Sequence, residues 1–251
     1  MNQRQAENTL SVIYTLCTFF GATASITAGI AWSHWKDTLN QCGTNLDFRN
    51  CSCIFYGKHT PNHFLGGDTA SCVWITFGPL LYVFISVGFA CYHGFRVLFG
   101  AKENTTRTIT SKNDAGETII MQAVHHNNIS LLSRCYWIFA ASMTSILTLY
   151  SLIHFSFYID GYFYTCRQYR QTLVNQLGIH GTLLPVLHNR LACNAIFDFM
   201  DYIQPDTGNA YRDGFINTAA DLIIGIITSL FAWVLFLYAS VLNIMFARKR
   251  V

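Results

Sequence analysis

Four apolar stretches constrain this chain more than any motif, because each is long enough to cross a bilayer. They occupy residues 10–32, 73–99, 136–159 and 217–246. A hydrocarbon core of about 30 Å needs about 20 helical residues, and a soluble domain of this size has no use for four such runs. The sequence therefore predicts an all-α integral membrane protein, built as a four-transmembrane-helix bundle.

The distribution of charge predicts which way the bundle faces. Basic residues exceed acidic ones in the segments that lie on the side of the two termini, and Arg248-Lys249-Arg250 ends the last apolar stretch. Because basic residues near span ends favour the cytosol, we expect a multi-pass plasma-membrane protein with both termini inside. The connecting segments are then the cytosolic 1–9, the extracellular 33–72, the cytosolic 100–135, the extracellular 160–216 and the cytosolic 247–251.

Cysteine positions agree with that orientation. Six of the nine cysteines fall in the two predicted outer loops: Cys42, Cys51, Cys53, Cys72, Cys166 and Cys193. An even number on the oxidising side predicts a cap held by two or three disulfides, with a composition that is compatible with small β elements. A Cys166–Cys193 bond is favoured because it closes the second loop, and Cys72 at a span entrance is placed to tie the cap to the bundle. The remaining pairings stay open.

Glycosylation sequons give a mixed signal. Asn50 begins a sequon in the first predicted outer loop and is the glycosylation candidate. Asn104 and Asn128 begin sequons in the loop that the charges place in the cytosol. Glycosylation of either would invert the predicted topology.

The first apolar stretch carries small residues at four-residue spacing. Gly21, Ser25 and Gly29 share one helical face, and small residues let helices approach closely in lipid. This face is predicted either to pack against another span of the chain or to meet a partner protein. The small-x-small tripeptide at Ala22 is compatible with signal cleavage, but the apolar run continues beyond it, so we expect a retained span.

Few ionisable residues lie inside the predicted spans. His93 and Arg96 fall near the inner end of the second, His154 near the outer end of the third, and Asp221 near the outer end of the fourth. Each is within a turn or two of an interface, where snorkelling or a helix cap accounts for it. A proton relay or ion path is the alternative, and His93, His154 and Asp221 are its candidates.

Several functional classes find no support. The net charge of +3 is scattered, without the basic stripe that nucleic acid requires. No metal-ligand spacing and no catalytic motif occurs, so we predict no metal, no cofactor and no enzymatic activity. Aromatic residues gather at predicted bilayer boundaries and are interpreted as an interfacial belt: Trp32, Trp35, Trp74, Tyr136, Trp137, Phe157, Tyr158 and Tyr162.

Short elements are also expected outside the spans. Residues 168–177 can continue the third span outward as a helix, and 191–197 have the periodicity of a short amphipathic helix. The segment 100–135 is polar and rich in threonine, which predicts a flexible loop.

The chain resembles the transmembrane protein 179 family of four-span proteins. The motifs that carry this resemblance are Asp47-Phe48-Arg49 followed by Cys51 and Cys53, Ser71-Cys72 entering the second span, His93 to Phe99 at its inner end, Gly161 with Cys166, and Cys193. The resemblance implies the four-span architecture and no particular reaction. Claudins and calcium-channel gamma subunits offer an architectural analogy only, because their Gly-Leu-Trp tripeptide beside paired cysteines is missing here.

By elimination, the predicted function is that of an accessory subunit. A stapled outer cap, a small-residue face and spans without a polar stripe suit a non-catalytic protein that binds a larger integral membrane protein, an ion channel or a receptor. A self-assembling transporter or pore is the first alternative. A cell-adhesion or junction module is the second.

Overall fold

The structure is a computed structural model of the full chain. It describes residues 3–39, 51–60, 64–99, 106–112, 118–124, 132, 134–178, 192–202 and 216–248. Cys42, Asn50, Asn104 and Asn128 lie outside these ranges, so the predictions for them stay predictions.

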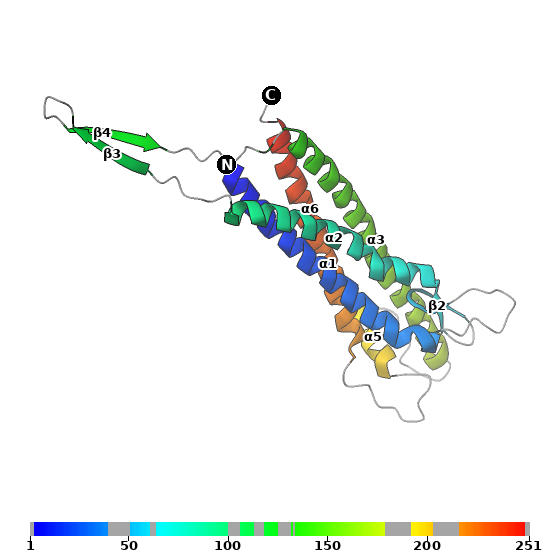
Figure 1. The fold of residues 1–251 in the computed structure, drawn as a ribbon. Helices are drawn as coiled ribbons and strands as arrows, with labels where there is room; N and C mark the ends of the chain where they lie inside the picture. Colours follow the sequence, from blue (N-terminus) through cyan, green and yellow to red (C-terminus); the bar gives the residue numbers. More distant parts are fainter. Residues whose placement is uncertain are drawn as a thin grey trace.

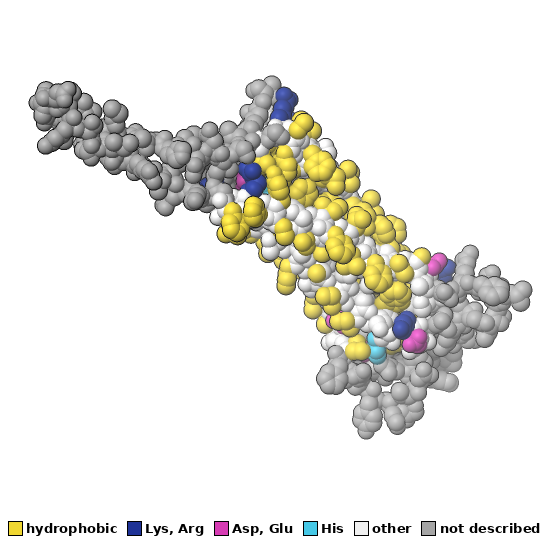
Figure 2. All heavy atoms as spheres, in the orientation of Figure 1, with side chains coloured by type: hydrophobic (Ala, Val, Ile, Leu, Met, Phe, Trp, Pro, Cys, Tyr) yellow, Lys and Arg dark blue, Asp and Glu magenta, His cyan; other side chains and the backbone are white. Residues whose placement is uncertain are grey.

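Long helices dominate the described part of the chain. Four are long and apolar enough to cross a membrane: α1 (Gln3–Leu39), α2 (Thr69–Phe99), α3 (Arg134–Gly178) and α6 (Thr218–Arg248). Together they form an elongated bundle whose two chain ends lie at the same end (Figure 1). Hydrophobic side chains cover the visible outer face, and charged side chains gather towards the two ends (Figure 2). The prediction of four apolar helices of spanning length is confirmed, and the chain is a multi-pass membrane protein.

The bundle has a definite order of neighbours. α1 packs along both α2 and α6, and α6 also packs along α3, whereas α2 and α3 touch over a shorter stretch. Glycines allow the closest approaches: a side chain at Gly21 would collide with Tyr82, and one at Gly225 would collide with Tyr158. In lipid, such close packing is a main source of helix association. We call the end with both chain ends the terminal end and the opposite one the disulfide end.

The disulfide end carries a small mixed cap. Strands β1 (Cys53–His59) and β2 (Phe64–Gly67) form an antiparallel hairpin, and a short helix, α5 (Cys193–Tyr202), lies beside them. β1 rests on α3, where Thr165 Oγ1 donates to the Ile54 carbonyl at 2.9 Å. Gly161 lets the hairpin come close, because an added Cβ would lie 3.0 Å from the Tyr56 ring.

Disulfides join the cap to the helices. Cys53 bonds Cys72, which ties β1 to the first turn of α2, and Cys166 bonds Cys193, which ties α3 to α5. Both bonds follow the roles that the sequence analysis favours for Cys72 and for the second loop. Cys51 is disulfide-bonded as well.

The helices reach further than the apolar stretches. α1 begins at Gln3 rather than at residue 10, so the predicted polar lead is largely helical, and α3 continues to Gly178 as the 168–177 segment predicts. The predicted amphipathic helix at 191–197 is present, shifted to Cys193–Tyr202.

The prediction of a flexible loop at 100–135 is wrong in part. Strands β3 (Thr106–Lys112) and β4 (Thr118–Val124) pair there as an antiparallel hairpin in continuous register. Both strands are rich in the β-branched residues Thr, Ile and Val, which favour extended backbone. The polar composition of the segment masked this preference.

Candidate functional site

The small-residue face of α1 lies inside the bundle. Gly21 abuts Tyr82 of α2, and a Cβ added at Gly29 would lie 3.3 Å from the Thr76 side chain. Between them, Ser25 Oγ donates a 2.6 Å hydrogen bond to the Thr76 carbonyl. Of the two interpretations of this face, the structure therefore supports packing within the chain.

His154 replaces a backbone hydrogen bond that is missing from the proline-containing helix. Pro79 lies inside α2 and has no N–H, so the carbonyl of Ile75 lacks the donor that an α-helix directs to it. His154, on α3, places Nε2 2.9 Å from that oxygen. Because a carbonyl only accepts, Nε2 carries the hydrogen and donates. The side chain is fully buried, so the expectation that it snorkels to an interface is wrong.

Two further side chains bond the same stretch of α2. Tyr150 of α3 donates its hydroxyl to the Gly78 carbonyl at 3.1 Å, and Ser25 of α1 bonds Thr76 from the other side. We call Ser25, Tyr150 and His154, with the carbonyls they bond, the Pro79 site. Of these bonds, the one from His154 replaces the hydrogen bond that Pro79 removes, which is how membrane helices tolerate proline. The Pro79 site thus holds α2 between α1 and α3.

A second polar cluster lies towards the terminal end. His93 is fully buried, bonds the Tyr136 hydroxyl through Nε2 at 3.0 Å, and stacks on Tyr14 with ring centroids 5.9 Å apart. Asn243 of α6 donates to the Tyr14 hydroxyl at 2.9 Å and to Thr144 Oγ1 at 3.3 Å. The cluster joins all four long helices, and His93 serves this packing instead of snorkelling.

Glu7 and Arg96 close the cluster at the terminal end. Arg96 Nε lies 3.2 Å from Glu7 Oε2, with the Glu7 side chain 7% exposed, and Gln3 donates to Glu7 at 2.7 Å. Sequence reasoning missed Glu7 and Asn243. The missed signal on α1 is its heptad-like series of buried residues: Glu7, Leu10, Tyr14, Cys17, Gly21, Ala24, Ala28, Ala31 and Trp35.

Asp221 belongs to the beginning of α6. It lies in the first turn, where a carboxylate interacts favourably with the helix dipole. The backbone N–H of Thr218 donates to Asp201 Oδ2 at 3.0 Å, and Trp35 of α1 donates to Thr218 Oγ1 at 2.9 Å. The capping hydrogen bonds at this end come from Asp201 and from Asn217, whose Oδ1 accepts from the Ala220 N–H at 3.0 Å, and Asp221 lies next to this cap. Four residues of the predicted interfacial belt are all buried, so they do not belong to such a belt: Trp35, Trp137, Tyr158 and Tyr162.

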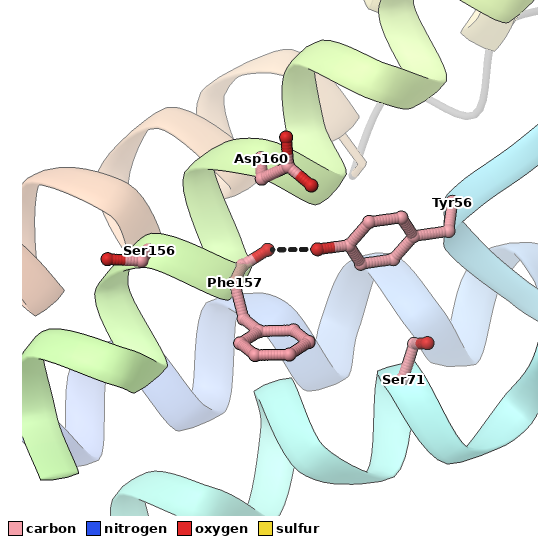
Figure 3. A pocket seen from close by; sticks show the side chains of 5 residues that line it. All are labelled: Tyr56, Ser71, Ser156, Phe157 and Asp160. Carbon is pink, nitrogen blue, oxygen red and sulfur yellow. Dashed lines mark hydrogen bonds between the residues drawn. The ribbon is translucent and has the colours of Figure 1, made fainter.

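A pocket of about 480 Å³ opens on the seam between α2, α3 and the hairpin (Figure 3). Its lining residues are Tyr56, Ser71, Ser156, Phe157 and Asp160. Tyr56 reaches it from β1 by donating its hydroxyl to the Phe157 carbonyl at 3.1 Å. Burial, and then the nearby Asp160 carboxylate, raise the pKa of Tyr56 to about 12, which keeps that donor protonated.

The backbone at Tyr56 is unusual. Its φ is +60°, a left-handed conformation that bulky residues rarely adopt, and the register of β1 against β2 shifts between Cys53 and Lys58. Such irregularities re-aim a side chain, and here the Tyr56 ring turns onto α3. The pocket could not be predicted from the sequence, because the Tyr56 ring reaches it through this register shift.

The described residues contain no group of three or more His, Cys, Asp or Glu able to hold a metal ion. Comparisons of the chain with protein-family models, curated proteins and solved structures find no match. The resemblance to the transmembrane protein 179 family stays a prediction, and any function must be argued from the geometry above.

Proposed function

We propose that this protein is a non-catalytic accessory subunit that packs beside a larger integral membrane protein, an ion channel or a receptor, at the plasma membrane. The supporting observation is Gly88 of α2. A Cβ added there would meet nothing within 4 Å, whereas at every other glycine assessed in the described residues the nearest atom is 3.3 Å away or closer. Glycine in a helix is about 1 kcal/mol less favourable than alanine, and no contact among the described residues accounts for its presence at this position.

Gly88 lies in an exposed stripe of α2. Leu81, Phe84 and Phe95 are 51%, 73% and 63% exposed, and Cys91 is exposed as well. With Gly88 these residues follow a three-and-four spacing and share one face of the helix. A glycine between two large rings forms a notch into which a helix of another protein can pack closely. Flexible lipid tails can pack against a helix face without such a notch.

The buried polar groups support an accessory role over a transport role. His93 and His154 bond neighbouring helices, so two of the three candidates for an ion path already serve the packing of the bundle, and Asp221 lies in the first turn of α6. These contacts make a self-contained bundle that presents an apolar exterior to a partner.

The proposed orientation places the terminal end in the cytosol and the disulfide end outside. Three arginines lie at the terminal end of the bundle, which agrees with the positive-inside rule: Arg96, Arg134 and Arg248. The Cys53–Cys72 and Cys166–Cys193 bonds lie at the other end, where an oxidising compartment preserves them. The cap would then contact the outer domain of the partner.

Purification from native membranes tests the proposal. Tagged protein, extracted in mild detergent, should retain a channel or receptor in stoichiometric amount, identified by mass spectrometry. Gly88→Leu fills the notch and should reduce the retained partner about tenfold or more. Ser142→Leu, at an exposed position of α3, adds bulk outside the stripe and should retain it. A clean homo-oligomer would refute the accessory role and favour self-assembly, and equal partner loss in both variants would refute the stripe.

A further inference from the structure

The pocket on the seam between α2 and α3 lies at the depth of lipid headgroups. Asp160 is the first charged residue of α3 after Arg134, about 39 Å away along the helix at 1.5 Å per residue. On α2, Ser71 lies about 38 Å from Arg96 by the same measure. A bilayer including its headgroups is about 40–45 Å thick, so both helices place the pocket where one row of headgroups lies.

The walls of the pocket combine aromatic faces with one carboxylate. The Tyr56 and Phe157 rings have centroids 6.5 Å apart, and Tyr164 lies 5.7 Å from Tyr56. Phe157 is 48% exposed, which leaves its ring accessible from the bilayer side. Asp160 stands on the opposite side of the Tyr56 hydroxyl from Ser71 (Figure 3). Among the residues of the described chain that line this pocket, none is a lysine or an arginine.

We propose that this pocket binds the ammonium headgroup of a membrane phospholipid, with Asp160 as the counter-charge and the rings of Tyr56 and Phe157 as its aromatic wall. A quaternary ammonium is attracted to aromatic faces within about 6 Å, and a carboxylate supplies the opposite charge. The volume of about 480 Å³ is within the usual 300–1,000 Å³ range of small-ligand sites. The hydroxyl of Ser71 is available as a donor to the adjoining phosphate, whereas Ser156 Oγ already donates to the Leu152 carbonyl at 2.8 Å.

The position of the pocket favours a lipid over a free amine. Ile153, one helical turn before Phe157 on α3, is exposed and offers an apolar surface along which acyl chains can lie. A soluble ligand would gain nothing from that surface. The left-handed backbone at Tyr56 puts an aromatic ring in the pocket, where a regular strand would not.

Native mass spectrometry of the full-length protein tests this binding. The protein in mild detergent is equilibrated with equal amounts of phosphatidylcholine and phosphatidylglycerol, and retained lipid is counted. We expect phosphatidylcholine to exceed phosphatidylglycerol at least about threefold. Asp160→Asn should lower phosphatidylcholine retention about three- to tenfold. Asp37→Asn removes an exposed carboxylate of α1 and serves as the matched control, with no change expected.

Two further arms separate the possible outcomes. Phe157→Leu keeps the apolar volume but removes the ring, and it should weaken phosphatidylcholine retention about threefold while the unfolding temperature stays unchanged. Soluble glycerophosphocholine should bind far more weakly than the lipid. Equal retention of both lipids, or equal behaviour of the Asp160 and Asp37 variants, would overturn the proposal. Glycerophosphocholine binding as tight as that of the lipid would overturn the lipid source.

Discussion

Replacing His154 by leucine should destabilise the protein more when Pro79 is present than when residue 79 is alanine. In the wild-type chain the substitution leaves the Ile75 carbonyl buried without a donor. In a Pro79→Ala background, residue 79 regains an N–H, which donates to the Ile75 carbonyl within the helix. The test is therefore a double-mutant cycle between positions 154 and 79.

The expected coupling energy follows from the contacts of His154. Leaving a buried acceptor without a hydrogen bond costs about 1–3 kcal/mol in soluble proteins. Double-mutant cycles for hydrogen bonds between membrane helices give coupling energies that average about 0.6 kcal/mol and reach about 1.7 kcal/mol. We expect about 1 kcal/mol. His154 also touches the rings of Tyr82 and Tyr158, with centroids 6.2 and 6.1 Å away. Loss of that packing is common to both backgrounds and cancels in the cycle.

Unfolding in mixtures of mild detergent and SDS, followed by circular dichroism, measures the free energies. Ser25→Ala is the control, because Ser25 bonds the Thr76 carbonyl, whose intrahelical donor at Leu80 does not depend on Pro79. Its coupling to Pro79→Ala should stay below about 0.5 kcal/mol. If the two cycles gave equal coupling, His154 would not be the substitute donor, and the account of the Pro79 site would fail.

Three other substitutions probe the packing, the cap and the ion pair, each by the same unfolding measurement. Gly21→Ala puts a Cβ 2.5 Å from an aromatic carbon on α2 and should cost about 1–3 kcal/mol, whereas Gly29→Ala, at 3.3 Å, should change stability by less than about 0.5 kcal/mol; equal costs would contradict the close contact. Replacing both Cys166 and Cys193 by alanine should cost about 2–4 kcal/mol and expose α5 to protease before the long helices; unchanged proteolysis would show that α5 is held by other contacts. Glu7→Gln removes the charge beside a half-buried guanidinium of α2 and should cost about 1.5–3 kcal/mol, little changed by salt; a loss that vanished in high salt would place the pair in open solvent.

The spans were predictable because a run of apolar residues is a property of one segment alone. Whether a side chain in such a run faces lipid or another helix depends on its neighbours. Trp35 illustrates this: at the end of an apolar stretch it is typical of an interfacial belt, yet it is buried because Thr218, 183 residues away, accepts its N–H. Glu7 was assigned to the cytosolic segment 1–9 for the same reason, since its partner Arg96 lies on another helix.

The conformation of the cap also depends on more than the residues of one segment. The composition of the first outer loop is compatible with a small β cap, but the left-handed backbone at Tyr56 has no signature in the residues around it. The pocket collects residues from β1, α2 and α3. No single window of sequence contains it, and it exists only because Gly161 lets the hairpin settle on α3.

The central position of α6 has a consequence for biogenesis. Spans leave the ribosome in order, and α6 is synthesised last. Until it arrives, α1 and α2 can pair, but α3 lacks its principal neighbour, and Tyr14 and Thr144 lack the amide of Asn243. A chain arrested before α6 would leave the Tyr14 hydroxyl without its amide partner within the bilayer. Insertion of the last helix is therefore the step at which membrane quality control can distinguish a finished molecule from an unfinished one.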